Sequence, residues 1–80
     1  MRVEITMPHL GDGDEPLKIV SWLKQVGDQV ERGEAIAEIE TDKSTVDLEA
    51  FQSGTLAEIV HGPDALGSPG EVIGYLEVGA

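Results

Sequence analysis

The chain has 80 residues, an apolar share of 40% and a formal charge of −11, with 16 acidic side chains against 5 basic ones. This charge repels nucleic-acid phosphates and anionic membrane surfaces, and the absence of cysteine excludes disulfides and thiolate metal sites. A chain of this length forms one thin core without room for a deep substrate cavity, so we expect a small, soluble, monomeric domain that is not an enzyme and has no membrane-spanning segment.

Short segments of alternating apolar and polar residues, separated by turns that contain glycine, predict an all-β fold. The expected strands cover residues 2–7, 18–24, 28–31, 35–41, 45–50, 55–60, 66–67 and 72–78. All four prolines lie in or beside the turns, where a missing amide donor costs little. We expect a flattened barrel or sandwich of two small antiparallel sheets.

The first long loop, "LGDGDEP", combines two glycines with an acidic run. A phosphate-binding loop is excluded because the carboxylates repel phosphate and no helix follows, and the run lacks the ligand spacing of a calcium loop. His9 and His61 are far apart in the sequence and do not form a zinc pair, so both are expected in solvent. Trp22, Phe51 and Tyr75 are each expected to lie in the core or to be half-buried.

A single lysine, Lys43, interrupts the acidic segment "AEIETDKSTVDLEA" (residues 37–50) at the point where two expected strands meet. A catalytic amine is disfavoured here, because the neighbouring carboxylates and the exposed hairpin tip both favour the charged form of lysine. Two interpretations remain open from the residues alone. Lys43 is either an ordinary solubilising turn residue or a lysine displayed on a rigid hairpin for covalent modification.

The chain also repeats itself at an offset of 37 residues, because "GEAIAEIE" (33–40) aligns with "GEVIGYLE" (70–77) and "IVSWL" (19–23) with "LAEIV" (56–60). We interpret residues 17–40 and 54–77 as two pseudo-repeats, related by a quasi-two-fold axis, within a single domain that covers residues 1–80. The same offset relates Lys43 to Ala80. We therefore expect the Lys43 turn and the chain end to lie at opposite ends of the domain.

The segment "EIETDKSTVDLEA" resembles the lipoyl-attachment motif of lipoyl domains, which form the N-terminal part of acyltransferase subunits in 2-oxo acid dehydrogenase complexes. The segments "MPHLGDGDEPLKIVSWL", "GTLAEIV" and "GEVIGYLEV" are similar to other parts of these domains, in the same order along nearly the whole chain. The resemblance implies that Lys43, at a hairpin tip, carries lipoate in amide linkage. The chain departs from the family at Ser44, where alanine is commoner, at Pro16-Leu17, where Glu-Gly is frequent, and in "HGPDALGSPG", where a Gly-Asp turn is usual.

The same resemblance implies a set of partners. A lipoate ligase or a lipoyl/octanoyl transferase would recognise Glu40, Asp42 and Ser44 around the lysine. The cognate thiamine-diphosphate-dependent dehydrogenase would recognise the first loop, which consists of Leu10, Gly11, Asp12, Gly13, Asp14 and Glu15. The other implied partners are an acyltransferase core and a flavin-dependent dihydrolipoamide dehydrogenase. The expected compartment is the cytoplasm of a bacterium or the mitochondrial matrix of a eukaryote.

Two alternatives to a lipoyl carrier stay open. Biotin-carrier domains share the expected fold, but they have Met-Lys-Met at the tip, whereas this chain has Asp42-Lys43-Ser44. The chain could also be a β-rich interaction module in which Lys43 is never modified. The motif is shared by pyruvate, 2-oxoglutarate, branched-chain and acetoin complexes, so it does not choose among them.

Overall fold

The computed structural model describes residues 1–10 and 15–79, which form eight strands and no helix. The strands are β1 (Arg2–Thr6), β2 (Leu17–Trp22), β3 (Gln29–Val30), β4 (Ala35–Glu40), β5 (Thr45–Glu49), β6 (Gly54–Ile59), β7 (Leu66–Gly67) and β8 (Val72–Glu77). Their bounds differ from the expected ones by at most two residues, so the predicted all-β fold is confirmed. The described residues accordingly contain no helix that is long and apolar enough to span a membrane.

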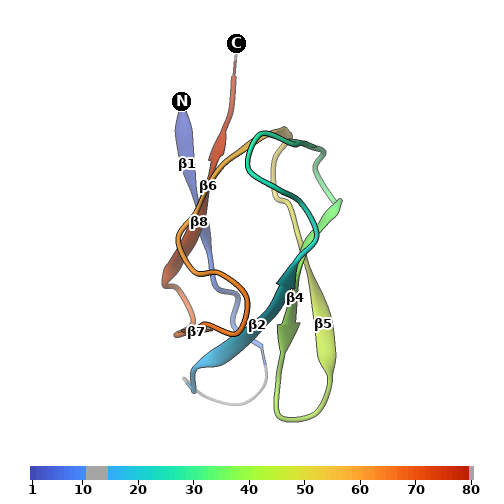
Figure 1. Ribbon diagram of the computed structural model, residues 1–80, viewed down its shortest axis with the longest axis vertical. Helices are drawn as coiled ribbons and strands as arrows, with labels where there is room; N and C mark the ends of the chain where they lie inside the picture. The colour runs from blue at the N-terminus through green and yellow to red at the C-terminus, as the bar shows by residue number, and fades with distance from the viewer. Residues whose placement is uncertain (11–14, 80) are drawn as a thin grey trace.

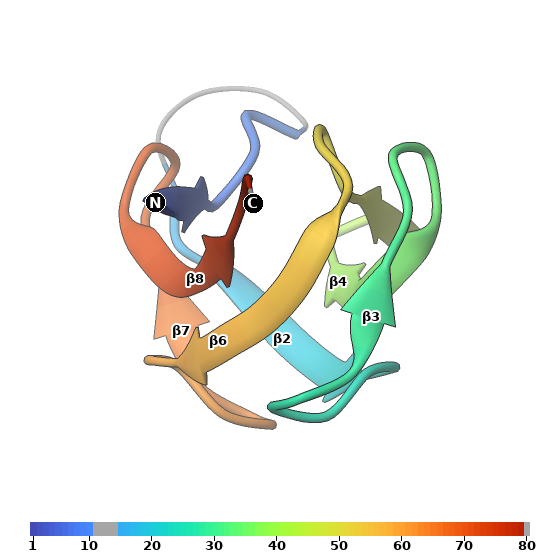
Figure 2. The ribbon, with the colours of Figure 1, turned by 90° about the horizontal axis from the view of Figure 1, so that it is seen from above.

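The strands form two antiparallel four-stranded sheets, one with the order β1-β8-β6-β3 and the other with the order β5-β4-β2-β7. Seen along the long axis in Figure 2, the strands are arranged around a common core. The two sheets do not join into one continuous barrel, so the sandwich is the form that the chain adopts. Strands β4 and β8 are each hydrogen-bonded on both sides, which makes them rigid supports for the turns that follow them.

The core lies between the sheets because side chains alternate between the two faces of each strand. In β4, Ala37 and Ile39 are buried, whereas Glu38 and Glu40 lie on the outer face. The largest fully buried side chains are Ile5, Met7, Ile19, Val30, Ile36, Ile39, Leu56, Ile73 and Leu76. No polar or charged residue is buried in the part of the chain that the structure describes. The core formed by these described residues is therefore wholly apolar, and none of their charged side chains is fully buried.

The two halves of the chain have the same local structure. Strands β2, β3 and β4 recur 37 residues later as β6, β7 and β8, with every bound shifted by the same amount. The turns recur too, because the Gly27 N–H donates to the Leu56 carbonyl at 2.8 Å and the Asp64 N–H, 37 residues on, donates to the Ile19 carbonyl at 2.7 Å. Gly27 and Asp64 both have positive φ, at 101° and 70°. Glycine adopts this conformation freely, whereas aspartate adopts it at some cost.

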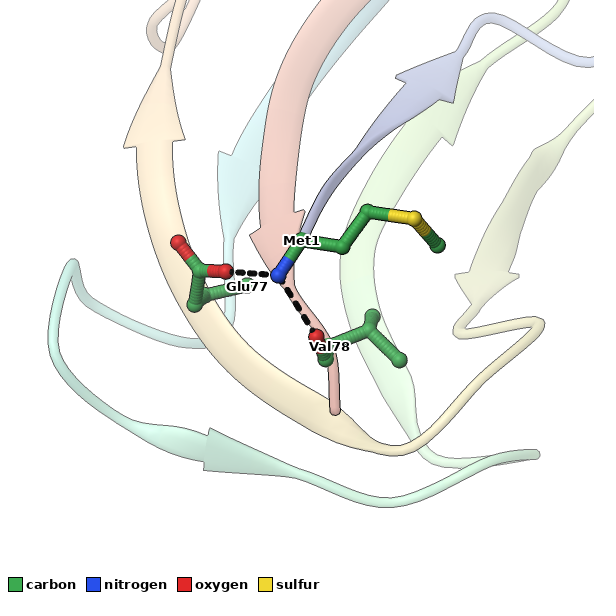
Figure 3. Close-up of polar contacts among 3 residues, drawn as sticks. All are labelled: Met1, Glu77 and Val78. Atoms are coloured by element: carbon green, nitrogen blue, oxygen red, sulfur yellow. Dashed lines mark hydrogen bonds and ion pairs between the residues drawn. The ribbon is translucent and has the colours of Figure 1, made fainter. Parts of the chain in front are cut away.

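The longest dimension of the molecule is 38 Å. Figure 1 shows the start of β1 and the end of β8 at the top, and the turn between β4 and β5 at the bottom. The Met1 amine donates to the Glu77 carboxylate and, at 2.8 Å, to the Val78 carbonyl (Figure 3). This ammonium group lowers the pKa of Glu77. Ala80 lies outside the described residues, but β8, whose last residue is Glu77, ends at the opposite end of the domain from the β4–β5 turn, as Figure 1 shows.

Two expectations about single side chains are wrong. Phe51 is 48% exposed, because β5 has already ended at Glu49 and Ala50 is the last buried residue before the chain turns. His61 is not in solvent, since its side chain is only 19% exposed and its Nε2 lies 3.0 Å from the Glu71 carboxylate. Trp22 and Tyr75 are half-buried, as expected, and the Trp22 indole N–H donates to the His61 carbonyl at 2.7 Å.

Candidate functional site at the tip of the β4–β5 hairpin

The candidate site is the connection between β4 and β5, which are antiparallel neighbours. Their last pair is Glu40 with Thr45, so residues 41–44 form a four-residue turn beyond the sheet. On the inner face Ile39 is paired with Val46, and both belong to the apolar core or pack against it. Because β4 is also paired with β2, the base of the hairpin is held from two sides. The hairpin is a rigid support for whatever its turn displays.

The turn is closed by hydrogen bonds from Thr41. Its N–H donates to the Ser44 carbonyl at 2.8 Å, and its hydroxyl donates to the same carbonyl at 2.8 Å. The hydroxyl oxygen accepts from the Ser44 N–H at 3.1 Å and from the Lys43 N–H at 3.2 Å. Thr41 had no predicted role. The signal was nevertheless present, because threonine at the first position of a turn is able to bond the backbone two or three residues on.

Lys43 differs from the other two lysines in its surroundings. Lys18 lies 3.5 Å from the Asp64 carboxylate, and Lys24 lies 2.7 Å from the Glu34 carboxylate. The hydrogen bond to Glu34 raises the pKa of Lys24 above its ordinary value of 10.5, which makes its neutral, nucleophilic form rarer. Lys43 is exposed and takes part in no ion pair within residues 1–10 and 15–79. Its amine is therefore the lysine amine that projects most freely from the described surface.

The outer face of the hairpin is acidic. Glu38 and Asp47 are cross-strand partners, and Glu40 and Glu49 lie further along the same face, two residues away on their own strands. The Ser21 hydroxyl donates to Glu38 at 2.8 Å. A surface of this sign attracts a basic partner and repels an anionic one.

The site residues expected from the sequence lie in two places. Glu40, Asp42, Lys43 and Ser44 are all exposed and together form the end of the β4–β5 hairpin. In the first loop, Glu15 is exposed, whereas Leu10 is half-buried and packs against the core. The expectations for Gly11, Asp12, Gly13 and Asp14 fall outside the described residues. No group of three or more side chains suited to holding a metal ion is found among the residues that the structure describes.

Comparison with known proteins assigns the chain to a family. The model of the biotin/lipoyl family, described as "Biotin-requiring enzyme", matches residues 3–76. The chain belongs to this family. Its members carry covalently attached biotin or lipoate, so the exposed lysine at a hairpin tip fits what the family requires.

The similar proteins include two acyltransferase subunits. The chain is 43% identical over 77 residues to the dihydrolipoyllysine-residue succinyltransferase component of the 2-oxoglutarate dehydrogenase complex from Bacillus subtilis, which covers 96% of this chain. It is 48% identical over 60 residues, or 75% of its length, to the dihydrolipoyllysine-residue acetyltransferase component of the pyruvate dehydrogenase complex from Rhizobium meliloti. The chain spans only 18% and 13% of these two relatives.

The fold matches a solved lipoyl domain along its whole length. The solution structure of the lipoyl domain of the 2-oxoglutarate dehydrogenase complex from Azotobacter vinelandii superposes with a TM-score of 0.79 at 32% identity. The match covers 98% of this chain and 99% of that domain. The architecture described above, with two four-stranded sheets, is therefore that of a lipoyl domain.

Proposed function

We propose that the chain is a lipoyl carrier domain in which lipoate is joined by an amide to Nζ of Lys43. The observation that carries this proposal is the position of Lys43, exposed at the tip of the β4–β5 hairpin in a member of the biotin/lipoyl family. No described side chain forms an ion pair with its amine, and the residue is exposed. A modifying enzyme therefore reaches the Lys43 amine without first breaking a salt bridge.

Lipoate is favoured over biotin by the residues on either side of the lysine. Asp42 and Ser44 are polar and exposed, whereas biotin-carrier domains have methionine at both positions. An enzyme that selects between the two types of domain has these side chains within reach of the reacting amine. We assign the recognition of the modifying enzyme to Glu40, Asp42 and Ser44, which share the exposed end of the hairpin.

The domain itself carries and does not catalyse. A lipoyl group held on Nζ of Lys43 would supply a disulfide that accepts an acyl group together with two electrons. The partners that this chemistry would require are a thiamine-diphosphate-dependent dehydrogenase to load the acyl group, an acyltransferase core to pass it to coenzyme A, and a flavin-dependent dihydrolipoamide dehydrogenase to restore the disulfide. The hairpin holds the attachment point clear of the sheets, and β8 ends at the opposite end of the 38 Å axis. Attachment to the protein keeps the group at high effective concentration near the successive active sites.

The surface around Lys43 sets which dehydrogenase accepts the domain. The carboxylates on the outer face of β4 and β5 give this end a negative potential, which favours a dehydrogenase with a basic entrance. Leu10 and Glu15, at the ends of the first loop, and the residues between them are assigned to the same recognition. The choice among pyruvate, 2-oxoglutarate, branched-chain and acetoin complexes is left to experiment, because the similar proteins include components of two of them.

The proposal is tested by mass spectrometry of the intact chain after incubation with a lipoate ligase, ATP and lipoate. The expected result is one lipoyl addition, mapped to Lys43 and absent from Lys43→Arg, while Lys18→Arg and Lys24→Arg are modified like the parent chain. A parallel reaction with a biotin ligase, ATP and biotin is expected to leave the chain unmodified. A folded chain that takes biotin and not lipoate would establish the biotin-carrier alternative, and a folded chain that takes neither would refute both.

A further inference from the structure

The Lys43 turn is the one part of the proposed attachment site whose conformation is set by a single side chain. Asp42, Lys43 and Ser44 are all exposed, and the last strand pair before the turn is Glu40 with Thr45. The core therefore does not hold the backbone of the turn in place. What holds it is Thr41, whose N–H donates to the Ser44 carbonyl and whose hydroxyl makes three hydrogen bonds to the backbone of Lys43 and Ser44.

The hydroxyl takes the place of a backbone group. In a four-residue β-turn, the last N–H commonly donates to the carbonyl of the first residue. Here the Ser44 N–H donates to the Thr41 hydroxyl oxygen at 3.1 Å, and the Lys43 N–H converges on the same oxygen at 3.2 Å. The hydroxyl hydrogen in turn is given to the Ser44 carbonyl at 2.8 Å. One side chain thus fixes the amides of the attachment lysine and of the residue after it.

We propose that Thr41 is a positioning residue for the modification of Lys43, because its hydroxyl selects the backbone conformation in which the lysine is presented to the modifying enzyme. This inference rests on the proposed function, since it concerns how the same lysine is displayed. Without the hydroxyl, the Lys43 and Ser44 N–H groups donate to water instead, and the exposed turn populates other conformations. The enzyme then meets the productive conformation less often.

The chain itself indicates that the hydroxyl is not needed for the fold. The residue 37 positions after Thr41 is Val78, which follows β8 as Thr41 follows β4. The Val78 N–H donates to the Met1 carbonyl at 2.7 Å, and the corresponding Thr41 N–H donates to the Ser44 carbonyl at 2.8 Å. Valine therefore supports the same backbone closure at the end of a strand. The substitution Thr41→Val removes the hydroxyl and introduces the side chain that the fold already has at the equivalent position, Val78.

The test compares Thr41→Val with Thr41→Ser, which keeps the hydroxyl, and with Thr45→Val as a matched control just beyond the turn. Modification by a lipoate ligase is measured as kcat/KM with the whole chain as substrate. We expect kcat/KM to fall about tenfold in Thr41→Val, which corresponds to about 1.4 kcal/mol, and to stay within about twofold in Thr41→Ser and Thr45→Val. Thermal unfolding reports whether each variant is folded, and Thr41→Ala replaces Thr41→Val if the valine variant is not.

Amide hydrogen exchange supplies a readout that does not depend on modification. The Lys43 and Ser44 amides are expected to exchange about tenfold faster in Thr41→Val, whereas the amides of β4 and β5 keep their rates. Unchanged exchange at both amides, or equal modification of Thr41→Val and Thr41→Ser, would overturn the role of Thr41. A parent chain that is not modified at all would instead overturn the proposed function, so the two failures are distinguishable.

Discussion

The two ends of the domain are built on the same pattern but have different roles. One end displays Lys43, and the other holds the start of β1 beside the end of β8. At one end β4 runs through Thr41 into the Lys43 turn and returns as β5. At the other end β8 runs to Val78 and lies beside β1, with the Met1 amine bonded to the Val78 carbonyl. The closing backbone bond is the same at both ends, from Thr41 to Ser44 and from Val78 to Met1. The sheets therefore support either end in the same way, and a few residues specify the lysine turn in addition.

A second difference concerns the pairs of charges that link the loops. In the first half, Lys24 lies 2.7 Å from Glu34, and 37 residues later His61 lies 3.0 Å from Glu71. The two carboxylates play the same part, because each also accepts a backbone N–H three residues before it, at Glu31 and Ser68. The lysine partner of the first half is thus replaced by a histidine in the second. The halves share their geometry and differ in the cationic residue type that meets the carboxylate.

The largest expected effect tests whether the two halves contribute equally to the stability of the common core. Ile36 and Ile73 are the same residue type 37 positions apart and are 1% and 0% exposed. Ile36→Ala and Ile73→Ala are each expected to lower the free energy of unfolding by about 2–5 kcal/mol, through lost burial and the cavity left behind. Urea unfolding measures both, with the exposed Phe51→Ala as the control, expected within about 0.5 kcal/mol of the parent.

Equal costs at the two isoleucines would support an equivalent role for the halves. Ile36→Val and Ile73→Val, each expected to cost about 0.5–1.5 kcal/mol, serve if the alanine variants do not fold. A difference between the two sites of more than about 2 kcal/mol would show that one half dominates the stability, and the structural repeat would then have no energetic counterpart.

A smaller effect is expected where the halves use different residues for one backbone conformation. Gly27 and Asp64 have the same role and positive φ, and a Cβ at Gly27 would meet no atom within 4 Å. We expect Asp64→Gly to raise the free energy of unfolding by about 0.5 kcal/mol and Gly27→Ala to lower it by about 1 kcal/mol, because the strain of a side chain at positive φ is relieved at position 64 and introduced at position 27. Asp64→Asn is the control, since it removes the exposed pairing with Lys18 and keeps a residue that tolerates positive φ. A loss of stability in Asp64→Gly alone would contradict this account.

The sequence predicted the strands because their signals are local. Alternating residues such as Ala37, Glu38, Ile39 and Glu40 indicate a strand with one buried face, and the 37-residue repeat gives the same strand twice. The exposed lysine turn followed from the same alternation. The sequence did not indicate which polar groups meet across the fold. The His61 ring lies 3.0 Å from the Glu71 carboxylate, and the His61 carbonyl accepts a hydrogen bond from the Trp22 indole, contacts that depend on how the loops are placed.

The smallest expected effect is the pH dependence of the two loop pairs. The Lys24 ammonium and the Glu31 N–H lower the pKa of Glu34 below its ordinary 4.5, and the Ser68 N–H and then His61 lower the pKa of Glu71. A carboxyl whose pKa is lower in the folded state contributes stability above its unfolded value, and that stability is lost as the pH falls through the folded value. Both pairs should therefore steepen the loss of stability below pH 4.5.

The two pairs, Lys24 with Glu34 and His61 with Glu71, are expected to differ in how they affect stability at alkaline pH. Glu34 raises the pKa of Lys24 above 10.5, and a raised folded pKa gives stability that is present below the unfolded value and lost as the pH rises through the folded one. Melting temperatures from pH 2 to 11.5 are compared with those of Glu49→Gln, which removes one exposed carboxylate and so corrects for the general charge of −11. We expect Glu71→Gln to flatten only the acidic limb and Glu34→Gln to flatten both limbs. If Glu34→Gln leaves the alkaline limb unchanged, the Lys24 pair makes no contribution in solution, and the two halves differ in sequence there without differing in their response to pH.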